Sequence, residues 1–266
     1  MKLIVLGSGT SHGIPVIGCD CPVCHSRAPR DKRTRASLFI AGDEGEAAVI
    51  DTGPEFRLQA IRTGIHKLDA VFLTHAHADH LHGLDDVRSL TREKPLPVYG
   101  NRATLREVEE RFSYAFRQTQ RGGGKPRLVL VEAEGPVSLG SLRFTPVPVK
   151  HGRLDILGWR IDGGTPAPAV YLTDISEISP AARKTIGRPE VLIIDGLRAR
   201  PHETHFTFEQ ALVCAVEMDA RRVFLTHICH DCTHREINKY CRTFIKTRGL
   251  SGISMEAAWD GLTIVL

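Results

Sequence analysis

Short apolar runs with the length of a β-strand recur along the chain, and most of them stop abruptly at a polar or charged residue. Between several of these runs, apolar residues recur at the spacing of one helix face, and this alternation predicts a β/α fold. We expect strands at residues 3–6, 37–40, 47–50, 71–73, 95–100, 142–149, 170–172, 191–194 and 223–225. We expect helices at residues 56–63, 102–118 and 207–218, and another that begins within residues 81–84.

The pentapeptide Val-Phe-Leu-Thr-His occurs twice, at residues 71–75 and at residues 223–227. In both copies an apolar run of strand length ends in a histidine. A repeat of this kind predicts two similar β/α halves, each of which brings side chains from its strand ends to one edge of the molecule.

The first copy opens the stretch with the densest metal-binding chemistry. It continues so that His75, His77, Asp79 and His80 fall within six residues. Packed cores have little use for such side chains. Imidazoles bind Zn²⁺, Mn²⁺ or Fe²⁺, and a carboxylate among them is typical of a site that holds a water on the metal. The alternative is a histidine-rich loop without a ligand, which this spacing at a strand end disfavours.

Three further candidate ligands, His151, Asp174 and His227, each follow a predicted strand. With the four residues of the histidine motif they make seven candidates. An open catalytic site uses about three protein ligands and a water for each ion, so seven candidates indicate two ions. Two neighbouring metal ions that share a hydroxide are typical of ester hydrolysis.

Asp51 ends the strand predicted at residues 47–50 and is the candidate for an orienting role. A carboxylate at a strand end can accept an imidazole N–H and so fix which ring nitrogen faces a metal. An aspartate that only forms a turn is the alternative at this position.

A second cluster of ligand chemistry is the C-x-C-x2-C pattern of Cys19, Cys21 and Cys24. Three thiolates need a fourth ligand to close a tetrahedral zinc site. His25 is nearest in sequence, but its adjacency to Cys24 gives it poor geometry. If the fold brings the distant segments together, the better candidates are Cys229, His230 and Cys232. Three unrelated buried cysteines are the alternative.

With 266 residues, 42% of them hydrophobic and 25% charged, the chain can bury a full core, and we expect a single domain over residues 1–266. The net charge of +4 fits an anionic substrate but falls short of the dense basic surface that favours nucleic acid. No apolar run approaches the roughly 20 residues of a membrane span, and no signal-peptide pattern opens the chain. We therefore expect a cytoplasmic protein with no membrane partner.

The H-x-H-x-D-H motif, the later lone histidine, the strand-end aspartate and the last histidine together resemble the metallo-β-lactamase superfamily. The resemblance covers nearly the whole chain. It implies an α/β fold of four layers, the αβ/βα sandwich, with a dinuclear metal site at the sandwich edge. The implied ligands are His75, His77 and His151 for one ion, Asp79, His80 and His227 for the other, and Asp174 as the bridge.

Within the superfamily, residues 11–24 and residues 226–230 resemble the phosphoribosyl 1,2-cyclic phosphate phosphodiesterases of phosphonate breakdown. In that group, three N-terminal cysteines and a histidine three residues after the last catalytic ligand hold a structural zinc. The resemblance therefore implies a zinc-binding loop at residues 18–25. Its ligands would be Cys19, Cys21, Cys24 and His230, with Cys229 and Cys232 as possible substitutes for the histidine.

The segment at residues 201–212 resembles the part of these enzymes that supplies a histidine beside the metals. His205, directly before the predicted helix, is the better match, and His202 is its competitor. A histidine with a pKa near neutrality can protonate a leaving oxygen. We therefore expect Asp79 and His205 to be catalytic; a helix-entry histidine without a catalytic part is the alternative.

These features predict a metal-dependent phosphodiesterase that acts on a small, cyclic phosphate ester, such as a phosphoribosyl cyclic phosphate. The hydroxide would bridge two ions of Mn or Zn. The first alternative is a tRNA 3′-end-processing endonuclease of the RNase Z type, whose basic arm would have to come from residues 101–127. A lactonase or thioesterase and a non-catalytic cofactor carrier are the others, and the complete ligand set disfavours the carrier. Relatives are often dimers, so the resemblance also implies a homodimer.

Overall fold

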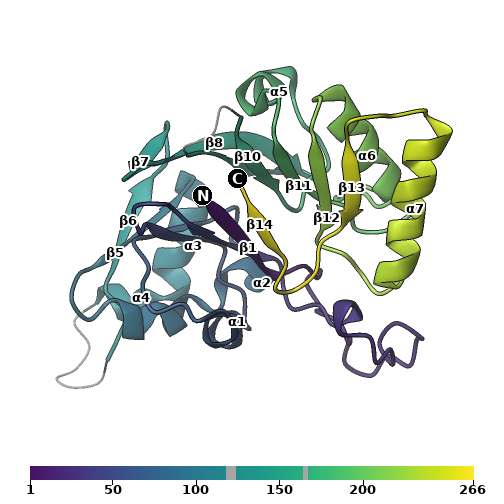
Figure 1. Cartoon of the computed structure of the whole chain (residues 1–266). Helices are drawn as coiled ribbons and strands as arrows, with labels where there is room; N and C mark the ends of the chain where they lie inside the picture. Colours follow the sequence, from purple (N-terminus) through teal and green to yellow (C-terminus); the bar gives the residue numbers. More distant parts are fainter. Residues whose placement is uncertain (118–123, 164–166) are drawn as a thin grey trace.

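Two β-sheets face each other in the middle of the molecule, and helices cover the outer face of each (Figure 1). The computed structural model describes residues 1–117, 124–163 and 167–266. The layers run helix, sheet, sheet, helix, so the predicted four-layer αβ/βα sandwich is confirmed.

The first sheet contains the N-terminal strands and the last strand of the chain. Its strands are β1 (Lys2–Gly7), β2 (Ser37–Ala41), β3 (Ala47–Ile50), β4 (Ala70–Phe72), β5 (Leu96–Gly100), β6 (Leu128–Glu132) and β14 (Thr263–Val265). Their order across the sheet is β14-β1-β2-β3-β4-β5-β6. From β3 to β6 the strands are parallel. Because parallel strands end at the same edge, β3 and β4 present their carboxyl ends together.

The second sheet repeats this arrangement. Its strands are β7 (Val137–Leu139), β8 (Leu142–His151), β9 (Leu154–Asp162), β10 (Ala169–Leu172), β11 (Val191–Asp195), β12 (Arg222–Thr226) and β13 (Ser254–Ala257). The order is β13-β12-β11-β10-β9-β8-β7, and β10 to β13 are parallel. The two predicted halves are thus present, with one exception: β14 crosses back and pairs with β1 of the first sheet.

Helices close the outer faces, with α1–α4 on one side and α5–α7 on the other (Figure 1). Their bounds are α1 (Phe56–Thr63), α2 (Ala78–Leu81), α3 (Arg102–Arg111), α4 (Ser113–Phe116), α5 (Pro180–Ile186), α6 (Phe208–Glu217) and α7 (His234–Thr247). Two short 3-10 helices lie at Pro29–Asp31 and Leu84–Leu90. Both α6 and α7 begin at a threonine, Thr207 and Thr233, whose side chain accepts a hydrogen bond from the third helical residue in a capping box.

Three apolar layers hold the sandwich together, one between the sheets and one beneath each set of helices. The central layer contains the fully buried rings of Phe72, Phe144 and Trp159. The strands β10 and β11 are buried along their whole length. Strands that are covered on both faces need apolar residues at every position, which explains their continuous apolar runs.

Two predicted helices differ from the structure. The helix expected to begin within residues 81–84 begins at Ala78, so Asp79 and His80 lie on its first turn. The helix expected at residues 102–118 is divided at Phe112, which is buried and has non-helical dihedral angles (φ −107°, ψ 31°). Residues 118–123 lie outside the described residues; they include the last residue of that helix prediction and part of the segment 101–127 named as the candidate RNase Z-type arm. In the described ranges, no helix combines the length and the apolar character of a membrane span.

Candidate active site

The seven predicted metal ligands meet at the edge where the parallel strands of both sheets end. They form two groups, His75, His77 and His151 in one, and Asp79, His80, Asp174 and His227 in the other. Within each group, one ligand atom of every residue lies within 4.8 Å of the others. A ligand atom of Asp174 also lies within 4.8 Å of one from His151, which places this carboxylate between the two groups.

The second group has the atom spacing of a metal site rather than of a hydrogen-bonded cluster. The His80 Nε2 atom is 3.1 Å from Asp79 Oδ2 and 3.1 Å from Asp174 Oδ2. The His227 Nε2 atom is 3.2 Å from Asp174 Oδ1. Both buried ring nitrogens nevertheless have no hydrogen-bond partner among the described residues. Ligands bonded at about 2.0–2.1 Å to one tetrahedral ion lie about 3.3 Å apart, so the donor set fits a divalent ion.

The local charges keep the carboxylates of the site in the ionised form that binds metal. Burial raises the pKa of Asp174, but the charges of His227 and His80 outweigh it and hold the pKa well below its ordinary value. The balance is the same for Asp79. Burial, helped by the charge of His80, lowers the pKa of His75 well below its ordinary value. Carboxylates that stay ionised and an imidazole that stays neutral are the forms that ligate a cation.

Asp51 lies behind the second group and orients one of its members. This fully buried carboxylate accepts hydrogen bonds from His80 Nδ1, Thr74 N and Thr74 Oγ1, each at 2.8 Å. With Nδ1 engaged, the Nε2 atom of His80 faces Asp79 and Asp174. The nearby Gly53 allows this close packing, because a Cβ atom there would lie 2.2 Å from the carbonyl oxygen of Asp79.

Of the two candidate proton donors, His205 is the one beside the ligands. Its Nδ1 atom donates to Asp195 Oδ2 at 2.8 Å. Its ring stacks on that of His227, with centroids 4.9 Å apart, and lies 4.8 Å from the ring of His151. The competitor, His202, is exposed and accepts at Nδ1 from the Thr204 amide at 3.3 Å.

Asp195 was not among the site residues predicted from the sequence. A signal for it was present, because Asp195 is followed by glycine at the end of an apolar strand, much as Asp51-Thr52-Gly53 follows β3. Burial raises the pKa of Asp195 well above its ordinary value and lowers the pKa of His205. A further contact had no sequence signal: the carbonyl oxygen of Thr204 accepts from His151 Nδ1 at 2.9 Å.

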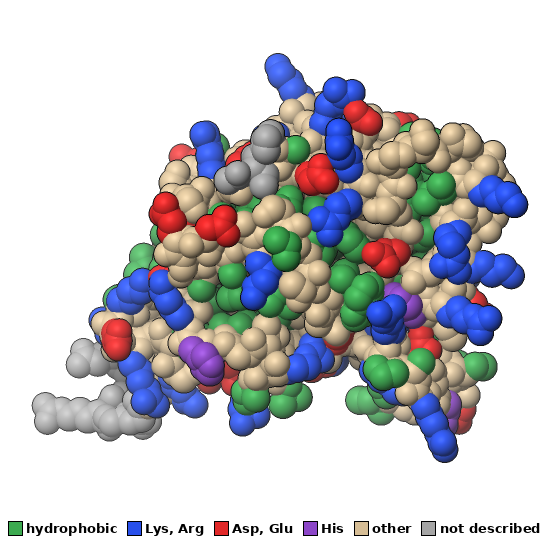
Figure 2. All heavy atoms as spheres, in the orientation of Figure 1, with side chains coloured by type: hydrophobic (Ala, Val, Ile, Leu, Met, Phe, Trp, Pro, Cys, Tyr) green, Lys and Arg blue, Asp and Glu red, His purple; other side chains and the backbone are tan. Residues whose placement is uncertain are grey.

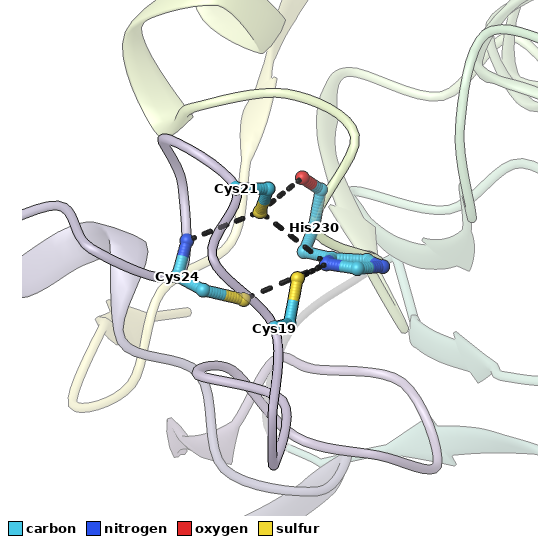
Figure 3. Close-up of side chains that lie close together, drawn as sticks. All are labelled: Cys19, Cys21, Cys24 and His230. Atoms are coloured by element: carbon cyan, nitrogen blue, oxygen red, sulfur yellow. Dashed lines mark hydrogen bonds between the residues drawn. The ribbon is translucent and has the colours of Figure 1, made fainter.

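The three cysteines form a second candidate metal centre together with a histidine that lies far away from them in the sequence. Cys19, Cys21 and Cys24 converge on His230, with Sγ to Nδ1 distances of 3.3, 3.4 and 3.5 Å (Figure 3). A tetrahedral zinc with ordinary Zn–S and Zn–N bonds requires S to N distances of about 3.5 Å. The Cys24 amide donates to Cys21 Sγ and lowers the pKa of this thiol to about 6, which favours the thiolate.

The alternative fourth ligands take no part in this cluster in the described structure. Cys229 and Cys232 offer their backbone carbonyl oxygens to Arg33, which donates to them at 2.7 and 3.1 Å. His25 is exposed and pairs with Asp20 at 3.1 Å. Arg33 therefore ties the N-terminal loop to the segment on both sides of His230 independently of any metal.

Several known proteins resemble this chain in sequence or in fold. An octanoyltransferase of Porphyromonas gingivalis is 40% identical over 233 residues, which are 86% of this chain but 46% of that protein. The chain thus spans about half the length of that relative. The crystal structure of a new diphosphatase from the PhnP family is 38% identical, with a TM-score of 0.86 over 100% of this chain and 97% of that one. The Zn(2+)-bound PqqB of Methylobacterium extorquens is 19% identical and shares the fold, with a TM-score of 0.80 over 100% of both chains.

The family comparison agrees with the fold and with the ligand pattern. Residues 47–228, more than half of the chain, match the model described as a Beta-lactamase superfamily domain. Divalent metal ions are the cofactors that this fold implies. The chain therefore belongs to the metallo-β-lactamase superfamily and resembles the PhnP-family diphosphatase.

Proposed function

We propose that the chain is a metal-dependent phosphodiesterase that hydrolyses a small phosphate ester, such as a cyclic phosphoribosyl phosphate, at a dinuclear centre. The observation that carries this proposal is that two metal-binding groups share one edge of the sandwich with a carboxylate-paired imidazole, His205 with Asp195. Paired metals and a proton donor are the parts that phosphoester hydrolysis needs.

Mn²⁺ or Zn²⁺ is the proposed occupant of the active site, because both accept a mixture of imidazoles and carboxylates. When bound, two such ions activate a water and withdraw charge from the phosphate oxygens. A third ion, Zn²⁺, is proposed for Cys19, Cys21, Cys24 and His230. The support for the active-site ions is that the buried Nε2 atoms of His80 and His227 have no hydrogen-bond partner among the described residues. The support for the third ion is the sulfur to nitrogen spacing described above.

In this proposal, side chains of the protein orient one metal ligand and transfer a proton to the leaving oxygen. Asp51 fixes the ring of His80 so that Nε2 points toward the ligand group. Asp195 fixes the ring of His205 through Nδ1, which leaves Nε2 as the atom that passes a proton to the departing oxygen. Burial lowers the pKa of His205, so its protonated form is a stronger acid than an exposed histidine. Such a donor contributes roughly 10² to 10⁴ in rate.

A diphosphate is a second candidate substrate class, supported by the name of the PhnP-family relative. The same displacement at phosphorus would break a P–O–P anhydride. The octanoyltransferase does not support acyl transfer by this chain, because that protein is about twice as long. A tRNA substrate has less support, because basic and acidic side chains are interspersed on the face drawn in Figure 2.

The proposal is tested with metal-stripped protein that is reloaded with Mn²⁺ or Zn²⁺. The substrates are bis-p-nitrophenyl phosphate and a ribose cyclic phosphate, and the variants are His205→Ala and, as a matched control, His202→Ala. We expect metal-dependent cleavage of both substrates. Cleavage of the ribose cyclic phosphate should fall at least about 100-fold in His205→Ala and change little in His202→Ala, whereas cleavage of bis-p-nitrophenyl phosphate should fall less, because p-nitrophenolate leaves without a proton. No cleavage by either metal form would refute the phosphodiesterase, and the reverse order of the two variants would refute the assignment of the proton donor.

A further inference from the structure

A cavity of about 290 Å³ opens directly beside the first ligand group. One wall consists of His75 and His77 themselves. The other walls are the first two turns of α3, through Ala103 and Glu107, and the start of β9, through Leu154. This volume is at the lower end of small-molecule pockets, so it suits a single ring system rather than a polymer.

Hydrogen bonds fix the walls of this pocket relative to the metal ligands. At one end of α3, Asn101 Nδ2 donates to the carbonyl oxygen of Asp155 in β9 at 3.0 Å. At the other end, Arg111 Nη1 donates to the carbonyl oxygen of Ala76, between two of the ligands, at 2.6 Å. A group bound in the pocket is therefore held at a defined position from the reacting phosphate.

The charges in the pocket are already paired. Arg111 donates to Glu107 Oε2 from Nε at 3.0 Å and from Nη2 at 2.7 Å, and Lys150 pairs with Asp155 at 2.6 Å. Among the described residues that line the pocket, Arg111 is the single arginine or lysine. A second phosphate on the substrate would need an uncommitted cation. Apolar walls such as Leu154 with the Glu107 carboxylate at the rim instead suit an uncharged, flat ring with an N–H donor.

The pocket lies on the side of the site away from the proposed proton donor. His205 contacts the rings of His151 and His227, whereas the pocket is lined by His75 and His77. The leaving oxygen has to be near His205. A group in the pocket is therefore attached to the phosphorus through the ester that is retained.

We propose that this pocket binds the base of a nucleoside whose phosphate carries the bond that is broken. The inference rests on the proposed function and narrows the substrate to a nucleoside phosphodiester or nucleoside diphosphate. In the reaction, the oxygen of water forms the new bond to phosphorus, the bond to the leaving oxygen breaks, and that oxygen takes up a proton. The nucleoside monophosphate is one product.

The kinetic test compares two esters that release the same p-nitrophenolate, thymidine 5′-(p-nitrophenyl phosphate) and methyl p-nitrophenyl phosphate. We expect kcat/KM to be at least about 10-fold higher for the thymidine ester. Ala103→Trp fills the pocket and should remove this advantage, so that the variant hydrolyses the two esters with similar kcat/KM. Glu109→Trp, at an exposed position of the same helix outside the pocket, is the matched control and should retain the advantage.

A binding test on the Mn²⁺-loaded protein does not depend on turnover. Isothermal titration should show that thymidine 5′-monophosphate binds at least about 10-fold tighter than methyl phosphate, and that Ala103→Trp abolishes the difference. Equal binding and equal kcat/KM would overturn the base pocket and leave the phosphodiesterase standing. Tighter binding of ribose 1,5-bisphosphate than of the nucleotide would overturn it in favour of a phosphate subsite. Base-dependent binding without any hydrolysis would support the pocket and refute the proposed function.

Discussion

The two copies of Val-Phe-Leu-Thr-His occupy equivalent places in the two sheets. Each lies next to a parallel strand that ends in an aspartate, Asp51 after β3 and Asp195 at the end of β11. Each aspartate accepts a hydrogen bond from an imidazole Nδ1 at 2.8 Å, from His80 in the first half and from His205 in the second. The similarity extends from the pentapeptide to its neighbours.

The copies differ in how their threonine is used. The amide and hydroxyl of Thr74 both donate to Asp51. The buried hydroxyl of Thr226 has no partner among the described residues, and Asp195 instead accepts from the Ile175 amide at 2.9 Å. The same local sequence therefore serves two tasks, because the carboxylate in the first half orients a proposed metal ligand and the one in the second half orients the proposed proton donor.

Each copy also makes hydrogen bonds to the half of the chain that forms the other sheet. The carbonyl oxygen of Thr74 accepts from the Leu157 amide of β9 at 3.0 Å. The segment after His227 exchanges hydrogen bonds with the loop after β1, from Ile228 N to Ser8 O at 2.9 Å and from Thr10 N to Ile228 O at 3.2 Å. Neither half can therefore complete the site alone.

The largest expected difference between the halves concerns the two oriented imidazoles. His80→Ala should lose an active-site ion and nearly all activity, because it removes a proposed ligand. His205→Ala should retain both ions and lose roughly 10² to 10⁴ in kcat. Metal analysis by mass spectrometry, combined with rate measurements, separates the two outcomes. Loss of metal from His205→Ala would identify His205 as a ligand, and the two imidazoles would then have the same role.

The cysteine cluster anchors only the second copy, through His230, three residues after His227. Cys21→Ser should remove one zinc per chain and lower the free energy of unfolding by several kcal/mol, within the roughly 10–16 kcal/mol that structural zinc can supply. Cys232→Ser, in the loop that contains His230 but outside the cluster, is the control. Zinc content and thermal unfolding measure the effect, and an unchanged zinc content in Cys21→Ser would contradict the site.

The two aspartates should respond differently to the same substitution. Asp51→Asn weakens the orientation of a metal ligand and should lower metal affinity about 10- to 100-fold. Asp195→Asn should leave metal affinity unchanged and lower kcat, because it acts on His205. Competition with a fluorescent chelator gives the affinities. Equal losses of metal in both variants would mean that the two aspartates have the same function.

The smallest effects are expected at the two threonines. Thr74→Val leaves the buried Asp51 short of one donor and should cost about 1–3 kcal/mol of stability. Thr226→Val removes a buried hydroxyl that has no partner among the described residues, so stability should stay the same or rise slightly. Denaturant unfolding of both variants measures the difference. A similar cost at both positions would show that Thr226 also makes a hydrogen bond in solution.

Much of the fold and of the grouping of the candidate metal ligands could be predicted from short stretches. Runs such as residues 191–194 are apolar at every position because β11 is buried on both faces. The ligands could be collected from the sequence because the ends of parallel strands meet at one edge. The helix at residues 56–63 was predicted to the residue, since Gly64 ends it with a left-handed φ of 72°.

Local sequence was sufficient for nine of the fourteen described strands, for the candidate ligands at strand ends and for the resemblance to a superfamily, because these depend on periodicity and spacing within a few residues. The strands β6, β7, β9, β13 and β14 were not predicted. Long-range packing was needed to place His205 rather than His202 against Asp195, to return β14 to the first sheet, and to divide the helix after Asn101 at Phe112. The pocket beside His75 could likewise be recognised only from the tertiary structure. Its walls come from α3 and from the start of β9. Contacts between segments that are so distant in sequence depend on how the sheets pack, and no local pattern encodes that packing.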